Sequence, residues 1–143
     1  MTTDGEFLAA LEACTLPASA FRHADHLRAA YLYLRAGSFA DAVARMTTAL
    51  RRYAASQGKP ERYHETITVA YLALINQHLH ERGDGGGWES FRRDNPALLD
   101  RRLLQHYYRP ETLGSARARQ VFLLGEYAPQ PYGAVALSTN RSS

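Results

Sequence analysis

The sequence contains one cysteine, Cys14, and one lysine, Lys59, among its 143 residues. A single cysteine excludes an internal disulfide and a metal cage built from thiolates. No apolar run is long enough to cross a bilayer, and the first residues lack the basic start and apolar stretch of a signal peptide. We therefore expect a cytoplasmic protein that has no contact with a membrane.

The positive charge comes almost entirely from arginine, which is typical of proteins from GC-rich bacterial genomes. Sixteen arginines and the one lysine face fourteen acids, so the net charge is +3. A nucleic-acid-binding protein would be expected to gather its basic residues on one face, with aromatic residues between them. Here they are scattered singly or in pairs along the solvent faces of the expected helices. The charge pattern therefore argues against a nucleic-acid partner.

Apolar residues recur at spacings of three and four, which is the period of a helix, and no strand-like alternation extends beyond a few positions. The pattern predicts helices that include 22–35, 61–82 and 115–124, and the second of these has almost no polar face. Such a helix belongs in the middle of a bundle. We expect an all-α fold, a single bundle of about five to seven helices over 1–126. An extended or partly disordered tail is expected over 127–143.

Three histidines lie near the starts of two expected helices. His23 and His26 are three positions apart on one helix face, and His64 precedes the longest apolar run. Two histidines at this spacing and a third from a facing helix could hold a divalent metal ion. The same residues could instead contact a substrate or act as a base, or they could be structural. We predict no cofactor, with a divalent metal as the alternative.

The acid–base hypothesis centres on His64 and Glu65, since the positive end of a helix dipole favours a carboxylate and a neutral imidazole. A neutral imidazole beside a carboxylate suits proton abstraction. We therefore assign catalytic roles to His64, Glu65 and His26. Tyr63 and, further along the same helix, Thr68 and Tyr71 would bind substrate, together with His23.

Two arginines near these blocks, Arg28 and Arg62, are candidates for binding an anionic group of the substrate. A guanidinium matches the geometry of carboxylate, phosphate or sulfate. The expected ligand is therefore a small, anionic metabolite.

Short blocks along the chain resemble an uncharacterised family of small bacterial proteins. The blocks are FRHADHL at 21–27, YHETIT at 63–68, HYYR at 106–109 and SAR at 115–117. In that family an aromatic-Thr-His-x-x-His-Leu block, a Tyr-His-Glu-Thr block and a Tyr-Tyr-Ser…Ala-Arg block recur in this order. The resemblance implies that the residues of the first two blocks share one site, and it implies no particular reaction. A looser fold-level similarity to DinB-like helical bundles is an analogy.

Three functions are compatible with these features. The first is an enzyme or enzyme subunit that uses proton abstraction, elimination or hydrolysis, in a pathway such as natural-product biosynthesis. The second is a metal-binding bundle with His23, His26 and His64 as ligands. The third is a non-catalytic accessory subunit that stabilises a larger protein partner.

Overall fold

The computed structural model describes residues 2–127, and within them the chain forms helices and no strand. The expected all-α fold is confirmed. The predicted tail over 127–143 lies outside the described residues, apart from its first residue. The α-helices are α1 (Asp4–Glu12), α2 (His23–Ala36), α3 (Phe39–Ser56), α4 (Glu65–Arg82), α5 (Trp88–Asp94), α6 (Pro110–Leu113) and α7 (Ala116–Gln120), and short 3₁₀ helices are η1 (Ala18–Ala20), η2 (Pro60–Arg62), η3 (Pro96–Leu99) and η4 (Leu103–His106).

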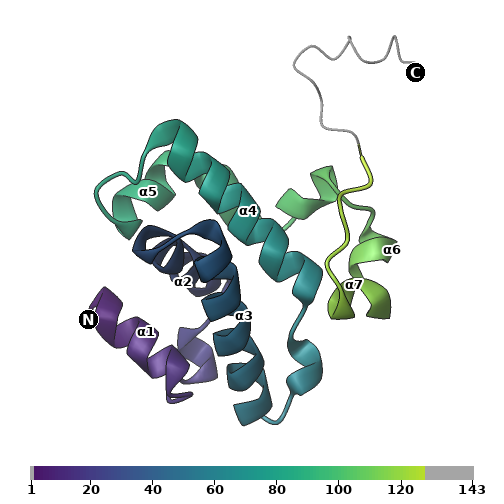
Figure 1. Ribbon diagram of the computed structural model, residues 1–143, viewed down its shortest axis with the longest axis horizontal. Coiled ribbons are helices and arrows are strands. Elements are labelled where there is room, and N and C mark those ends of the chain that lie inside the picture. Colours follow the sequence, from purple (N-terminus) through teal and green to yellow (C-terminus); the bar gives the residue numbers. More distant parts are fainter. Residues whose placement is uncertain (1, 128–143) are drawn as a thin grey trace.

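Helices α2, α3 and α4 pack against one another and form the centre of the bundle (Figure 1). The apolar faces predicted from the helical period supply the core between them, including Leu27, Leu50 and Leu72. Helix α1 packs on α3, α5 on α2, and α7 on α4. No helix within residues 2–127 combines the length and the apolar character that a membrane span requires.

Helix α4 begins at Glu65, four residues later than the sequence pattern predicted. Pro60 opens the separate 3₁₀ turn η2, and Tyr63 then takes an extended conformation. His64 is the N-cap of α4, because its Nδ1 atom accepts a hydrogen bond from the backbone N–H of Ile67 at 3.1 Å. The helix therefore starts only after Pro60 has ended the preceding pattern, and the connecting segment consists of η2 and the extended Tyr63.

The C-terminal part of the described chain is attached to the first turn of α4. Thr66, which is fully buried, donates a hydrogen bond from its hydroxyl to the carbonyl of Val121 at 2.7 Å. The same hydroxyl accepts the backbone N–H of Leu123 at 3.1 Å. Figure 1 shows α6 and α7 beside this end of α4. The last predicted helix ends at Gln120 because the chain turns extended at Val121 to meet Thr66.

Replacing Thr66 by valine should destabilise the protein by about 1–2 kcal/mol, because the isosteric side chain leaves both backbone partners without their hydrogen bond. The free energy of unfolding measured in urea tests this value. The matched control is Thr48→Val, an exposed threonine of α3, which should change the stability by less than about 0.5 kcal/mol. Equal stabilities of the two variants would show that Thr66 does not hold the C-terminal segment.

Candidate functional site

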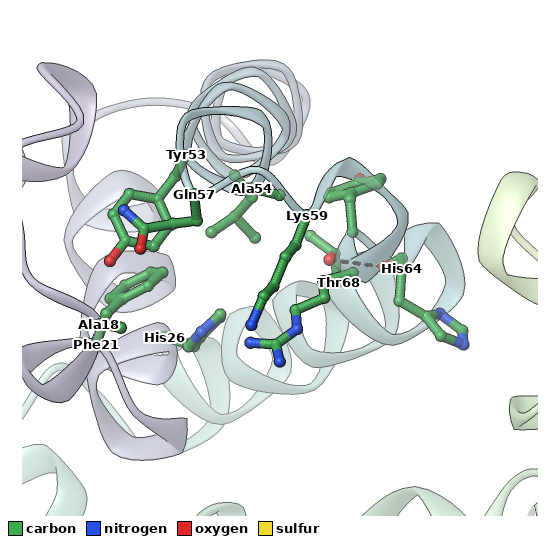
Figure 2. A pocket seen from close by; sticks show the side chains of 12 residues that line it. Ala18, Phe21, His26, Tyr53, Ala54, Gln57, Lys59, His64 and Thr68 are labelled. Carbon is green, nitrogen blue, oxygen red and sulfur yellow. Dashed lines mark hydrogen bonds between the residues drawn. The ribbon is translucent and has the colours of Figure 1, made fainter.

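A cavity of about 270 Å³, here called the outer cavity, lies between α2, α3 and the loop that leads into α4 (Figure 2). Its walls are mainly apolar, and its polar side chains come from α2, from the end of α3 and from residues 57–68. The residues that line it are Ala18, Phe21, His26, Leu50, Tyr53, Ala54, Gln57, Lys59, Arg62, Tyr63, His64 and Thr68. Both predicted blocks, 21–27 and 63–68, contribute to this cavity.

A second cavity of about 190 Å³, here called the inner cavity, lies between α2, α3 and α4. It is lined by His23, His26, Leu27, Ala30, Met46, Leu50, Ile67, Thr68 and Tyr71. Three of these residues, His26, Leu50 and Thr68, also line the outer cavity. One comes from each central helix, so the two cavities are adjacent and share these three side chains in their walls.

His26 lines both cavities, and its ring nitrogens form no hydrogen bond to another described residue. The ring stacks on Phe21, with 4.0 Å between the centroids and 22° between the planes. Within residues 2–127, the His26 ring has no hydrogen-bond partner, and no hydrogen bond contributes to its pKa. Burial lowers the pKa of His26 to about 4, the charge of His23 adds to the effect and Asp25 opposes it. The imidazole is therefore neutral at pH 7 and able to accept a proton or a hydrogen bond.

The His64 ring is bound at both nitrogens and performs a structural role. Nδ1 accepts the N–H of Ile67, so the proton of the neutral ring must be on Nε2, which donates to the carbonyl of Leu113 at 2.7 Å. Figure 2 shows this ring pointing away from the other labelled side chains of the outer cavity. Burial lowers the pKa of His64, which preserves the neutral form that the cap needs. The predicted role of His64 as a base has no free nitrogen to support it.

Glu65 does not orient His64, contrary to the sequence prediction. Its Oε1 atom accepts the hydroxyl of Tyr63 at 2.5 Å and a guanidinium N–H of Arg51 at 3.1 Å. Arg51 also lies over the Tyr63 ring, 4.6 Å from its centroid. Burial, and then the neighbouring carboxylate, raise the pKa of the Tyr63 phenol. Glu65 therefore fixes Tyr63 as a protonated wall of the outer cavity.

The remaining predicted contacts on α2 and α4 belong to the inner cavity. The ring of His23 meets the ring of Tyr71 edge to face, with 5.4 Å between the centroids. The Nε2 atom of His23 is buried and has no hydrogen-bond partner among the described residues. Burial lowers the pKa of His23, so both histidines of α2 favour the neutral form. Thr68 lies at the junction and donates its hydroxyl hydrogen bond to the carbonyl of His64 at 2.7 Å.

The two arginines predicted to bind an anion have different positions. Arg62 lines the outer cavity, whereas Arg28 lines neither cavity. The Arg28 guanidinium pairs with Asp4 at 2.7 Å and lies over the Phe7 ring, 4.4 Å from its centroid. Arg28 therefore holds α1 on the bundle and is not a substrate contact of this site.

Sequence reasoning missed Lys59, the only lysine of the chain, as a site residue. Its side chain extends over the outer cavity, with the amino group toward His26 in the view of Figure 2. Within residues 2–127, neither Lys59 nor Arg62 forms an ion pair, and no carboxylate lines either cavity. The signal in the sequence was its position just before Pro60, where the chain leaves α3 and turns toward the second block.

The three-histidine metal site predicted as an alternative is not assembled in the part of the chain described. No group of three His, Cys, Asp or Glu side chains there is placed to hold a metal ion. His23 and His26 remain near each other on α2, but the nitrogens of His64 are bound to Ile67 and Leu113.

Comparison of the chain with protein-family models, with curated proteins and with solved structures gives no significant match. The resemblance to a small bacterial family therefore stays a prediction, and the site must be interpreted from its own geometry.

The ring of His26 should stay neutral well below the pH at which a free histidine titrates. Nuclear magnetic resonance of the ring signals should give a midpoint near pH 4, against the ordinary value of 6.5. Because the folded-state pKa is below the unfolded value, His26 supports stability fully above about pH 6.5 and loses this contribution as the pH falls toward 4. In His26→Phe, the free energy of unfolding should fall less steeply over this range. A midpoint near 6.5 would contradict the buried, neutral ring.

Proposed function

We propose that this protein is a small cytoplasmic enzyme, or the subunit of one, that binds an anionic metabolite in the outer cavity and uses His26 as a base. The observation that carries the proposal is the His26 ring, which is neutral, faces the cavity and makes no hydrogen bond to the described residues. A perturbed titratable group in a concave, mainly apolar pocket is a typical feature of active sites.

The charges around the outer cavity favour an anion. Lys59 and Arg62 line it without carboxylate partners, and no acidic side chain lines it. Both cations are exposed, so they can meet a ligand at the mouth of the cavity. An arginine offers two parallel N–H donors to a carboxylate or phosphate, and a lysine adds a compact charge.

Binding of an anion would also make His26 a stronger base. The ring is disfavoured as a cation because burial removes water from it and because His23 lies nearby. A negative charge brought into the cavity favours the imidazolium form and raises the pKa of the ring. The ligand would therefore supply part of the driving force for its own deprotonation, which suits proton abstraction, elimination or base-assisted hydrolysis.

Exchange of carbon-bound hydrogen with solvent deuterium tests the role of His26. A panel of 2-oxo and 3-oxo acids is incubated in deuterium oxide with the protein and followed by nuclear magnetic resonance. At least one acid should exchange faster than in buffer, and His26→Gln should slow this exchange by about 100-fold or more. The proposed acid–base function is wrong if no acid exchanges above the buffer rate, or if His26→Gln, shown to be folded by circular dichroism, exchanges at the wild-type rate.

The affinity for an anion should depend on the two cations of the outer cavity. Lys59→Ala and Arg62→Ala should each weaken binding of an exchanging acid by about three- to tenfold, with the effect limited by solvent exposure. Arg93→Ala is the matched control, since Arg93 is an exposed arginine of α5 that lines neither cavity. Titration calorimetry measures the affinities. Unchanged affinity in the double variant Lys59→Ala, Arg62→Ala would contradict an anion site at this mouth.

A further inference from the structure

The inner cavity differs from the outer one in what lines it. It has no cation, and five of its lining side chains are aliphatic or thioether groups: Leu27, Ala30, Met46, Leu50 and Ile67. Its polar residues, His23, His26, Thr68 and Tyr71, carry no formal charge in the forms that burial favours for the two histidines and the tyrosine. A charged group would lose its hydration there without gaining an ion pair, so the inner cavity suits an apolar group.

We infer that the ligand is an amphipathic acid, with its anionic group at Lys59 and Arg62 in the outer cavity and an apolar chain or ring in the inner cavity. This inference rests on the proposed function and deepens it by naming the substrate class. The two cavities are adjacent, since His26, Leu50 and Thr68 line both of them, and the inferred ligand would extend past these side chains from one cavity into the other.

The position of His26 then selects the part of the ligand that reacts. Its ring lines both cavities and lies at their junction, between the cationic mouth and the apolar end. The ligand atoms that pass this junction are the carbons that adjoin the anionic group. The proton that His26 removes is therefore one on a carbon close to the acid, where a neighbouring carbonyl group would make it acidic.

The inner cavity also sets a limit on the length of the apolar group. Ala30 and Met46 line this cavity and are both buried, at 2% and 3% exposure, as part of the hydrophobic core. Protein interiors are densely packed and do not expand readily around an oversized group. Affinity should rise as the apolar chain fills the cavity and stop rising once it is full.

A series of straight-chain acids, from propanoate through hexanoate to decanoate, tests the inference by titration calorimetry and by the ring signals of His26. Each added methylene that enters the inner cavity should tighten binding by about fourfold until the cavity is filled. Alcohols of the same lengths are the control for simple hydrophobic association. They should bind at least about threefold more weakly than the acids, because they cannot pair with Lys59 and Arg62.

Two substitutions alter the inner cavity in opposite directions. Ala30→Leu places extra atoms in it and should abolish the gain with chain length while leaving propanoate affinity within about twofold of wild type. Met46→Ala enlarges the cavity and should move the plateau to longer acids, which keeps the test valid if Ala30→Leu does not fold. The matched control is Leu34→Ala, which removes a buried side chain of α2 that lines neither cavity and should leave the plateau where it is.

The outcomes separate the two proposals. Affinity that depends on Lys59 and Arg62 but not on chain length would overturn the amphipathic acid and leave the anion pocket intact. A length dependence that Ala30→Leu removes, without deuterium exchange in any acid, would support the binding site and overturn the acid–base function. Acids that leave the His26 signals unchanged at millimolar concentration would overturn both.

Discussion

The hydrogen bonds of the His64 ring join three parts of the chain at one point. Nδ1 begins α4 by accepting the N–H of Ile67, and Nε2 donates to Leu113 in the C-terminal segment. The backbone of the same residue follows the loop that carries Lys59 and Arg62. One side chain therefore links the end of the loop, the start of the helix and the attached segment on this side of the outer cavity. Thr66, two residues later, adds two more bonds to the same attachment.

This use of His64 is the reason that we propose His26, and not His64, as the base. A ring that caps a helix must keep Nδ1 free of a proton, and protonation would break the cap. His26 caps no helix, and its ring stacks on the ring of Phe21. Stacking holds the plane of the imidazole and leaves its nitrogens available. One block of the sequence thus builds a wall of the outer cavity, and the other supplies the imidazole that faces it.

The helical period was enough to predict the fold and most of the core. The apolar spacing of residues 22–35 and the almost all-round apolar character of 61–82 appear as α2 and α4 at the centre of the bundle, with α4 beginning at Glu65. The approach of the two blocks was also predicted, and residues from both line the outer cavity. The helix faces could be predicted because they depend on local residue patterns, whereas the shared site of the two blocks was implied by the family resemblance.

The roles of individual side chains could not be predicted, because they depend on partners far along the chain. Leu113 lies 49 residues from His64, and Asp4 lies 24 residues from Arg28. These two contacts remove a predicted base and a predicted anion contact from the site. Even with the helices in place, the tertiary hydrogen bonds decide what each of these two side chains contacts. Lys59 was overlooked because a residue in a helix-breaking segment has no periodic face that would place it.

The arrangement also gives a physical reason for placing a weak base at the boundary between a charged mouth and an apolar interior. At the surface, an imidazole would be half protonated near pH 6.5 and would meet water as readily as substrate. In the proposed function, His26 is half-buried beside both cavities and stays neutral, with its pKa near 4, until a negative group of the ligand enters beside it. An anion at Lys59 and Arg62 raises that pKa while excluding water from the cavity. On this proposal, proton transfer to His26 would be favoured chiefly when the cavity holds its ligand, so the burial that weakens the free base would also make the reaction selective.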